Sequence, residues 1–191
     1  MGLSPALLKK LKEAKATAGG NNITDGSYIF EVAELILDAK RKGTMFIPRL
    51  LVVESEKILV DVEPNQVGST CSNALNLDTN VSAPGNAKAF FMGLLNMTES
   101  EADEVVEKRK VDGEEVEFKR WMVKMDEYTR PSQLARGMLV GDETYRKTIQ
   151  TGPNAGKPFT AHNWVYIAQT SAEVAARRKA QDGTAASAAA K

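Results

Sequence analysis

Aromatic and cationic side chains gather in the last third of the sequence, in a combination that could hold the bases and phosphates of a nucleic acid. Residues 159–168 alternate in type as an extended strand does, and successive side chains of a strand point to opposite faces. We expect the more apolar face to enter the core: Phe159, Ala161, Asn163, Val165 and Ile167. The other face carries three rings among polar groups: Thr160, His162, Trp164 and Tyr166. Such rings stack on bases without sequence preference, for about 1 to 3 kcal/mol each.

Cations that could follow the phosphates lie on three neighbouring segments. Lys147 shares a face with Tyr145 on the preceding strand, Lys157 lies in the connecting turn, and Arg49 lies on an earlier strand. The residues predicted to contact nucleic acid are therefore Arg41, Lys42, Arg49, Tyr145, Arg146, Lys147, Lys157, Phe159, His162, Trp164 and Tyr166. The alternative is that Trp164 and Tyr166 pack beneath neighbouring helices, and that Arg41 and Lys42 form an ordinary polar turn.

Catalytic and metal-binding patterns are missing from the sequence. Residues 152–157 are one position too short for a phosphate-binding loop, and Pro158 stands where a magnesium-binding Ser or Thr would be. This segment is predicted to be a hairpin turn. His162 and Cys71 are the only residues of their types, which excludes a histidine-based metal site and an internal disulfide. We expect no enzymatic activity, no cofactor and no metal.

The composition is that of a globular domain rather than of a disordered chain. The 191 residues are 42% hydrophobic and 6% aromatic, and they carry 25 basic and 25 acidic residues, for zero net charge. A nucleic-acid site must therefore be a local patch. No stretch is apolar enough to span a membrane, and the beginning of the sequence lacks the apolar core of a signal peptide. We expect a cytoplasmic protein.

Hydrophobic periodicity predicts strands at both ends of a helical middle. A hairpin is expected over 27–54, with its turn at 38–43 and an edge or bulge at Pro48, followed by a third strand over 69–77. Predicted helices follow, over 87–97, 98–110 and 116–128. The chain then returns to strands over 134–140, 143–149 and 159–168. Because neither group of strands is stable alone, all of them are expected to share one sheet.

This order predicts an α+β, mainly β fold: an OB-like small β-barrel with a helical insertion at about 84–130. The barrel domain would span 23–169. Before it, residues 1–22 are expected to form a basic amphipathic helix, which either docks on the domain or serves as an arm that holds a polyanion. After it, residues 170–191 are expected to form a short helix over 171–181 and a disordered Ala-rich tail.

Short, glycine-rich motifs then suggest a family. They are the segments 25–32 and 42–46, the Val-Gly-Ser at 67–69, the segments 83–90 and 137–140, and a late strand ending in Trp164. Over residues 24–168 the chain resembles a family of tailed-phage early proteins, encoded among replication genes, that are themselves similar to OB-fold single-stranded-DNA-binding proteins. The resemblance implies a phage protein that coats single-stranded DNA during replication or recombination in a bacterial host. It implies no residue-level binding site.

The possible partners are less defined. Many replicative single-strand binders end in an acidic tail that recruits other enzymes, whereas the last nine residues here contain no acid. The acidic segment 99–107 would be the substitute for recruiting phage replication or recombination proteins, and both terminal helices could mediate an oligomer. A second class of function stays open: a non-catalytic phage structural or interaction protein that uses the barrel as a scaffold. Its contacts would run through Leu7 and Leu11 or through the acidic insertion.

Overall fold

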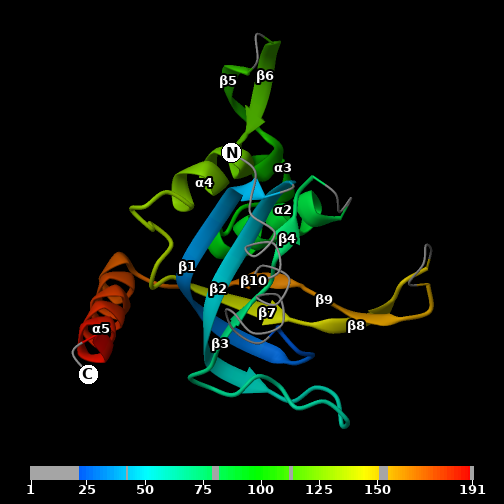
Figure 1. Cartoon of the computed structure of the whole chain (residues 1–191), viewed down its shortest axis with the longest axis vertical. Helices are drawn as coiled ribbons and strands as arrows, with labels where there is room; N and C mark the ends of the chain where they lie inside the picture. The colour runs from blue at the N-terminus through cyan, green and yellow to red at the C-terminus, as the bar shows by residue number, and fades with distance from the viewer. Residues whose placement is uncertain (1–21, 42, 79–81, 112–113, 151–154, 190–191) are drawn as a thin grey trace, which may run out of the picture.

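The computed structural model has an α+β, mainly β architecture (Figure 1). It describes residues 22–41, 43–78, 82–111, 114–150 and 155–189, and in them we find antiparallel sheets and four helices. The predicted N-terminal helix lies outside these ranges. None of the helices in the described part is long and apolar enough to cross a membrane.

A long hairpin forms the centre of the main sheet, as predicted. β1 (Ser27–Arg41) pairs with β2 (Gly43–Glu56), with Phe30 opposite Val52 and Val32 opposite Leu50. These four side chains are buried, because alternate residues of the two strands face the same side. A shift in register between Val32 and Glu34 then allows Leu35, three positions further on, to join the same core.

The predicted third strand is present in two pieces, and Pro48 lies where they separate. β3 (Thr70–Ser72) pairs with residues 49–51 of β2, and β4 (Leu75–Asn76) pairs with residues 45–46. On the other side Pro48 faces Leu35, whose backbone N–H and C=O are both bonded to the side chain of Gln133. Proline has no N–H to donate, so it is accommodated between the two short partner strands.

The last strands complete the sheet on its other side. β7 (Leu139–Glu143) pairs with β1, and β10 (Trp164–Tyr166) pairs with β7, so the strand order is β10-β7-β1-β2-β3, with β4 also on β2. β10 and β3 are the outer strands, and within the described residues the sheet does not close into a barrel. α2 (Ala83–Leu95), a predicted helix, packs on this sheet and buries Phe90, Phe91 and Leu94.

The predicted helix over 98–110 is present only in its first turn, and the predicted helix over 116–128 is present from residue 120 onward. Thr98 and Glu101 form the expected capping box, but the helix that they begin, α3 (Glu99–Asp103), has only five residues. The chain then forms a hairpin of β5 (Val105–Val111) and β6 (Glu114–Lys119), which projects at the top of Figure 1, before α4 (Arg120–Tyr128). The β-branched valines at 105, 106, 111 and 116 favour strands, and cross-strand ion pairs from Lys108 to Glu115 and Glu117 support them.

The predicted strand over 159–168 is two strands in different sheets. β9 (Pro158–Ala161) pairs with β8 (Tyr145–Thr148) in a two-stranded sheet of its own, whereas β10 joins the main sheet. The predicted disordered tail is also corrected, because α5 (Ser171–Ala189) continues through Gly183. Arg177 and Arg178 fasten this helix to the carbonyl oxygens of Gly137 and Arg136.

Gly93 provides a test of how closely α2 lies against β10. A Cβ atom at this position would be 2.8 Å from the backbone of Trp164, so Gly93→Ala should lower the free energy of unfolding by about 1 to 3 kcal/mol. The matched control is Gly85→Ala in the same helix, where a Cβ would meet nothing within 4 Å. Urea unfolding of both variants is the measurement. Equal stability of the two variants would contradict the close packing.

Candidate nucleic-acid interface

The β8–β9 hairpin, which we call the arm, projects from the body between β7 and β10, at the right of Figure 1. In its register Tyr145 lies opposite Ala161, and Lys147 lies opposite Phe159. Because directly opposite residues share a face and alternate residues return to it, Tyr145, Lys147 and Phe159 lie on one side of the arm. We call these three residues the ring face. Arg146 and Thr160, which also oppose each other, lie on the other side.

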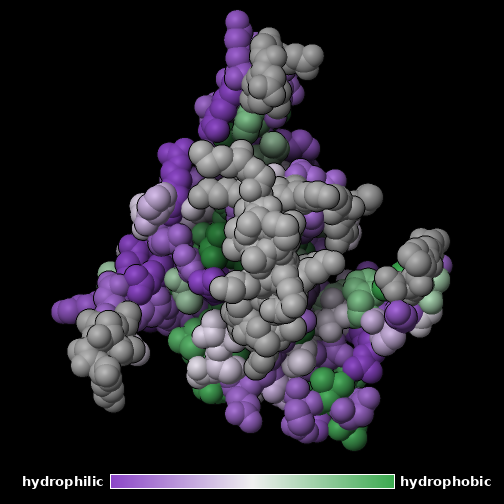
Figure 2. All heavy atoms as spheres, viewed as in Figure 1, coloured by the Kyte–Doolittle hydropathy of each residue, from purple (hydrophilic) through white to green (hydrophobic). Residues whose placement is uncertain are grey.

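The ring face is open to solvent and carries an unneutralised charge. Tyr145 and Phe159 are each 43% exposed. The Nζ atom of Lys147 lies 4.9 Å from the centroid of the Tyr145 ring. No carboxylate of the described residues makes an ion pair with Lys147. Hydrophobic and hydrophilic residues are mixed on the surface of the arm, at the right of Figure 2. This face can offer two stacking surfaces and one ammonium group to a ligand.

The other side of the arm is held against the body. The Arg146 guanidinium donates to the Oδ2 atom of Asp25, from Nε at 2.9 Å and with Nη2 at 2.7 Å, and the Thr160 hydroxyl donates to Oδ1 at 2.6 Å. Asp25 is buried. Arg146, predicted as a phosphate contact, therefore already has an internal anionic partner. Sequence reasoning missed this contact, which joins residues 121 positions apart.

Trp164 and His162 are inside the structure rather than on the ring face. Trp164 is only 9% exposed, and its ring packs edge-on against Phe90, with centroids 5.0 Å apart. His162 stacks on Trp164 and places Nδ1 2.7 Å from Oδ2 of the fully buried Asp142. The alternative reading, in which Trp164 packs beneath a helix, describes what is observed. The predicted alternation of faces fails because the chain leaves the arm and enters the main sheet at 162–163.

The remaining predicted residues are dispersed. Tyr166 is 39% exposed and borders a cavity of about 420 Å³ between α2, β10 and α5, away from the arm. Arg49 forms an ion pair with Glu34 across the central hairpin at 2.8 Å. Lys42 lies outside the described residues, and so does the side chain of Arg41.

Residues 152–157, the segment that resembles a phosphate-binding loop in sequence, lie in the connection between the two strands of the arm, as predicted. The backbone carbonyl of Lys157 accepts a hydrogen bond from the N–H of Ile149, and the N–H of Gly156 donates back to the carbonyl of Ile149. Residues 152–154 lie outside the described ranges, but the strands on either side pair as β8 and β9. The segment connects two antiparallel strands and has no helix after it that could bind a phosphate.

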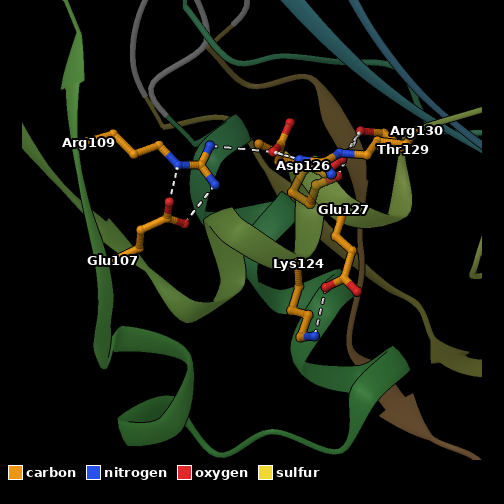
Figure 3. A network of polar contacts seen from close by, with 8 residues as sticks. Glu107, Arg109, Lys124, Asp126, Glu127, Thr129 and Arg130 are labelled. Atoms are coloured by element: carbon orange, nitrogen blue, oxygen red, sulfur yellow. Dashed lines mark hydrogen bonds and ion pairs between the residues drawn. The ribbon is translucent and has the colours of Figure 1, made fainter.

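The β5–β6 hairpin carries a similar combination whose charge is cancelled. The Arg109 guanidinium lies 4.5 Å above the centroid of the Phe118 ring. It also donates to Glu107 at 2.7 and 2.8 Å and to Asp126 at 3.4 Å, as Figure 3 shows. In the same network the Arg130 guanidinium, just after α4, donates to the carboxylate of Asp126, which lies in α4. This hydrogen bond lowers the pKa of the Asp126 carboxyl. These contacts fasten the hairpin to α4 and leave little charge for a polyanion.

Groups for other chemistry are not assembled in the described residues. Burial raises the pKa of the Cys71 thiol to about 12, so this thiol is not a nucleophile at neutral pH. No three His, Cys, Asp or Glu side chains of the described part are grouped in a way that could hold a metal ion.

The burial of Trp164 leads to a stability test that separates core rings from arm rings. We expect Trp164→Ala to lower the free energy of unfolding by about 3 to 5 kcal/mol, because it empties a space against Phe90. Phe159→Ala, which removes a ring from the arm surface, should change it by about 0.5 kcal/mol or less. Urea unfolding measures both. A larger loss for Phe159→Ala would contradict this placement.

Comparison of the chain with protein-family models, with curated proteins and with solved structures finds no match. The function must therefore be inferred from the geometry of the chain itself. The feature with a definite chemical meaning is the ring face of the arm, where two exposed rings and a cation lie side by side.

Proposed function

We propose that this protein binds single-stranded DNA without sequence specificity, through the ring face of the arm, and that it does so as a non-enzymatic phage protein of DNA replication or recombination. The observation that carries the proposal is the exposed set of Tyr145, Lys147 and Phe159 on one side of a projecting hairpin. Unpaired bases present flat apolar faces, whereas the bases of a duplex are stacked and inaccessible. A surface of rings with an adjacent cation is therefore suited to binding unpaired bases.

The connectivity of the main sheet supports an OB-like fold. Counted along the chain, its successive strands are β1, β2, β3 with β4, β7 and β10, and α2 lies between the third and the fourth. Their spatial order is fifth, fourth, first, second, third, all antiparallel. This corresponds to a five-stranded Greek-key OB barrel opened between its third and fifth strands. In OB folds, the connections between strands one and two and between strands four and five bind oligonucleotides. The arm is the second of these connections.

The distribution of charge supports a local contact rather than a wide electrostatic surface. Several cations on the body of the molecule have carboxylate partners, for example Arg49 with Glu34, Arg120 with Glu104 and Arg136 with Asp182. Arg177 and Arg178 of α5 instead donate to backbone carbonyl oxygens. Lys147 has no carboxylate partner among the described residues. With zero net charge overall, attraction to DNA must come from such unpaired cations and from stacking.

A second candidate function, protein interaction, has its own observation. The β5–β6 hairpin projects from the body, and in the described part of the chain neither of its strands pairs with a third strand. Free strand edges can accept a strand from a partner. On this hypothesis the arm would contribute nothing to nucleic-acid affinity, so the experiments below distinguish the two functions.

Removal of either exposed ring should weaken DNA binding. We expect Tyr145→Ala and Phe159→Ala each to cost about 1 to 3 kcal/mol of binding free energy, because each removes one stacking surface. Fluorescence anisotropy with labelled oligo-dT measures the affinity, and it does not depend on the buried Trp164. Phe118→Ala is the matched control, since it removes a ring beside a cation on the other hairpin. Unchanged affinity in both arm variants would reject the ring face as the binding site.

Loss of the unpaired ammonium group should change the dependence on salt. For a single-stranded ligand, each phosphate contact contributes about 0.7 to the slope of log K against log salt concentration, so Lys147→Ala should make that slope shallower by about this amount. The measurement is the same oligo-dT titration at several salt concentrations. The control is Lys108→Ala on the β5–β6 hairpin, whose ammonium group is paired with Glu115 and Glu117. An equal change in both variants would show that the effect is not local to the arm.

A further inference from the structure

The arm is mounted on the two residues that precede β1. Thr144, the residue before β8, is buried, and its hydroxyl both accepts from the backbone N–H of Gly26 at 2.6 Å and donates to the carbonyl of Gly26 at 2.8 Å. The backbone N–H of Thr144 donates to the same carbonyl at 3.1 Å. A Cβ at Gly26 would lie 2.8 Å from the ring of Tyr28, so glycine permits this ring to lie close to the backbone at residue 26. These contacts fix where the arm leaves the body.

Asp25, next to Gly26, holds both strands of the arm at once. Arg146 of β8 and Thr160 of β9 lie directly opposite each other, and each binds a different oxygen of the Asp25 carboxylate. The Asp25 side chain is only 5% exposed. A buried carboxylate that keeps two hydrogen-bonding partners is costly to leave unpaired, so rotation of the arm away from the body is opposed.

The positive charge of Arg146 is already paired with carboxylates of the chain. Its Nη2 atom lies 2.7 Å from Oδ2 of Asp25, and its Nη1 atom lies 3.7 Å from Oδ2 of Asp61. Two carboxylates therefore lie within ion-pair distance of one guanidinium. The adjacent Lys147 projects from the opposite face and has no such partner among the described residues. Neighbouring cations of the same strand thus have different roles.

We propose that Asp25, Arg146 and Thr160 form a latch that orients the ring face, and that Arg146 is a positioning residue rather than a phosphate contact. This inference rests on the proposed binding of single-stranded DNA. The latch fastens one face of a two-stranded sheet, and the rings occupy the opposite face, so fixing the first face fixes the direction in which the rings point. A fixed platform does not lose conformational freedom when bases stack on it, and this raises affinity.

The sign of one charge change tests the latch. Asp25→Asn removes a negative charge, so a purely electrostatic effect would make oligo-dT bind more tightly. The latch predicts weaker binding, by about five- to tenfold, because the arm loses its anchor for Arg146. Thr160→Val removes one hydrogen bond without any change of charge and should weaken binding in the same direction by a smaller factor. Unchanged or tighter binding in both variants would overturn the proposal.

The dependence on salt tests the assignment of Arg146. If Arg146 only positions the arm, Arg146→Gln should weaken oligo-dT binding without changing the slope of log K against log salt concentration. A slope shallower by about 0.7 would identify Arg146 as a phosphate contact and would overturn the proposal. In a double-mutant cycle, Asp25→Asn combined with Arg146→Gln should cost no more than the larger of the single effects, because both changes release the same latch.

Hydrogen exchange provides a readout that does not require DNA. In Asp25→Asn and in Thr160→Val, the amides of β8 and β9 should exchange faster, while those of β1 and β2 keep the protection of the wild-type chain. The control is Asp61→Asn, which removes an exposed carboxylate near Arg146 but leaves the latch intact, and it should exchange like wild type. If Asp25→Asn fails to fold, the exchange rates of the β8 and β9 amides in Thr160→Val test the latch alone.

The two proposals fail in different ways. If the wild-type chain does not bind oligo-dT, the proposed function is rejected, and the exchange of the arm amides still decides whether the latch exists. If the wild-type chain binds oligo-dT but the latch variants bind equally well and exchange as slowly, the function stands and the latch is rejected.

Discussion

The close contact between α2 and β10 is the constraint on which the rest of the structure depends. Gly93 lets the helix lie against the backbone of Trp164, and the Trp164 ring then packs on Phe90 in the core. This contact holds β10 beside β7 at the outer side of the sheet. The arm begins after β7 and returns into β10. The position of both ends of the arm therefore depends on α2, although this helix is not part of the arm.

Buried carboxylates continue this control beyond the apolar core. Asp142 accepts the backbone N–H of Asn163 and contacts the ring nitrogen of His162, where the chain returns from β9. Asp25 holds the two strands of the arm further out. Each carboxylate has specific partners, as a buried charge requires, and these partners lie close to the points where the chain passes between the arm and the body. Polar contacts therefore define the base of the arm, while its outer face remains exposed.

Local patterns in the sequence predicted local structure well. The central hairpin, α2, the capping box at Thr98 and the turn after β8 all follow from signals within a few residues, and all are present. The sequence predicts helices in place of the β5–β6 hairpin because the charged residues of this segment also fit a solvated helix face. The valines on both of its strands were the signal for β-structure.

The candidate site was only half predictable, for a different reason. Tyr145 and Lys147 are predicted to share a face because they are two positions apart on one strand. The alternation over 159–168 assigns Phe159 to the core face and Trp164 to the exposed face, on the assumption that one strand runs from 159 to 168, and the structure reverses both. Face alternation holds only within a strand, and it begins again where β10 joins another sheet. Likewise, nothing near Arg146 in the sequence indicates Asp25, so its neutralisation appears only in three dimensions. The same distinction separates the two hairpins: each has a ring beside a cation, and the position of the carboxylates decides which cation is left for a ligand.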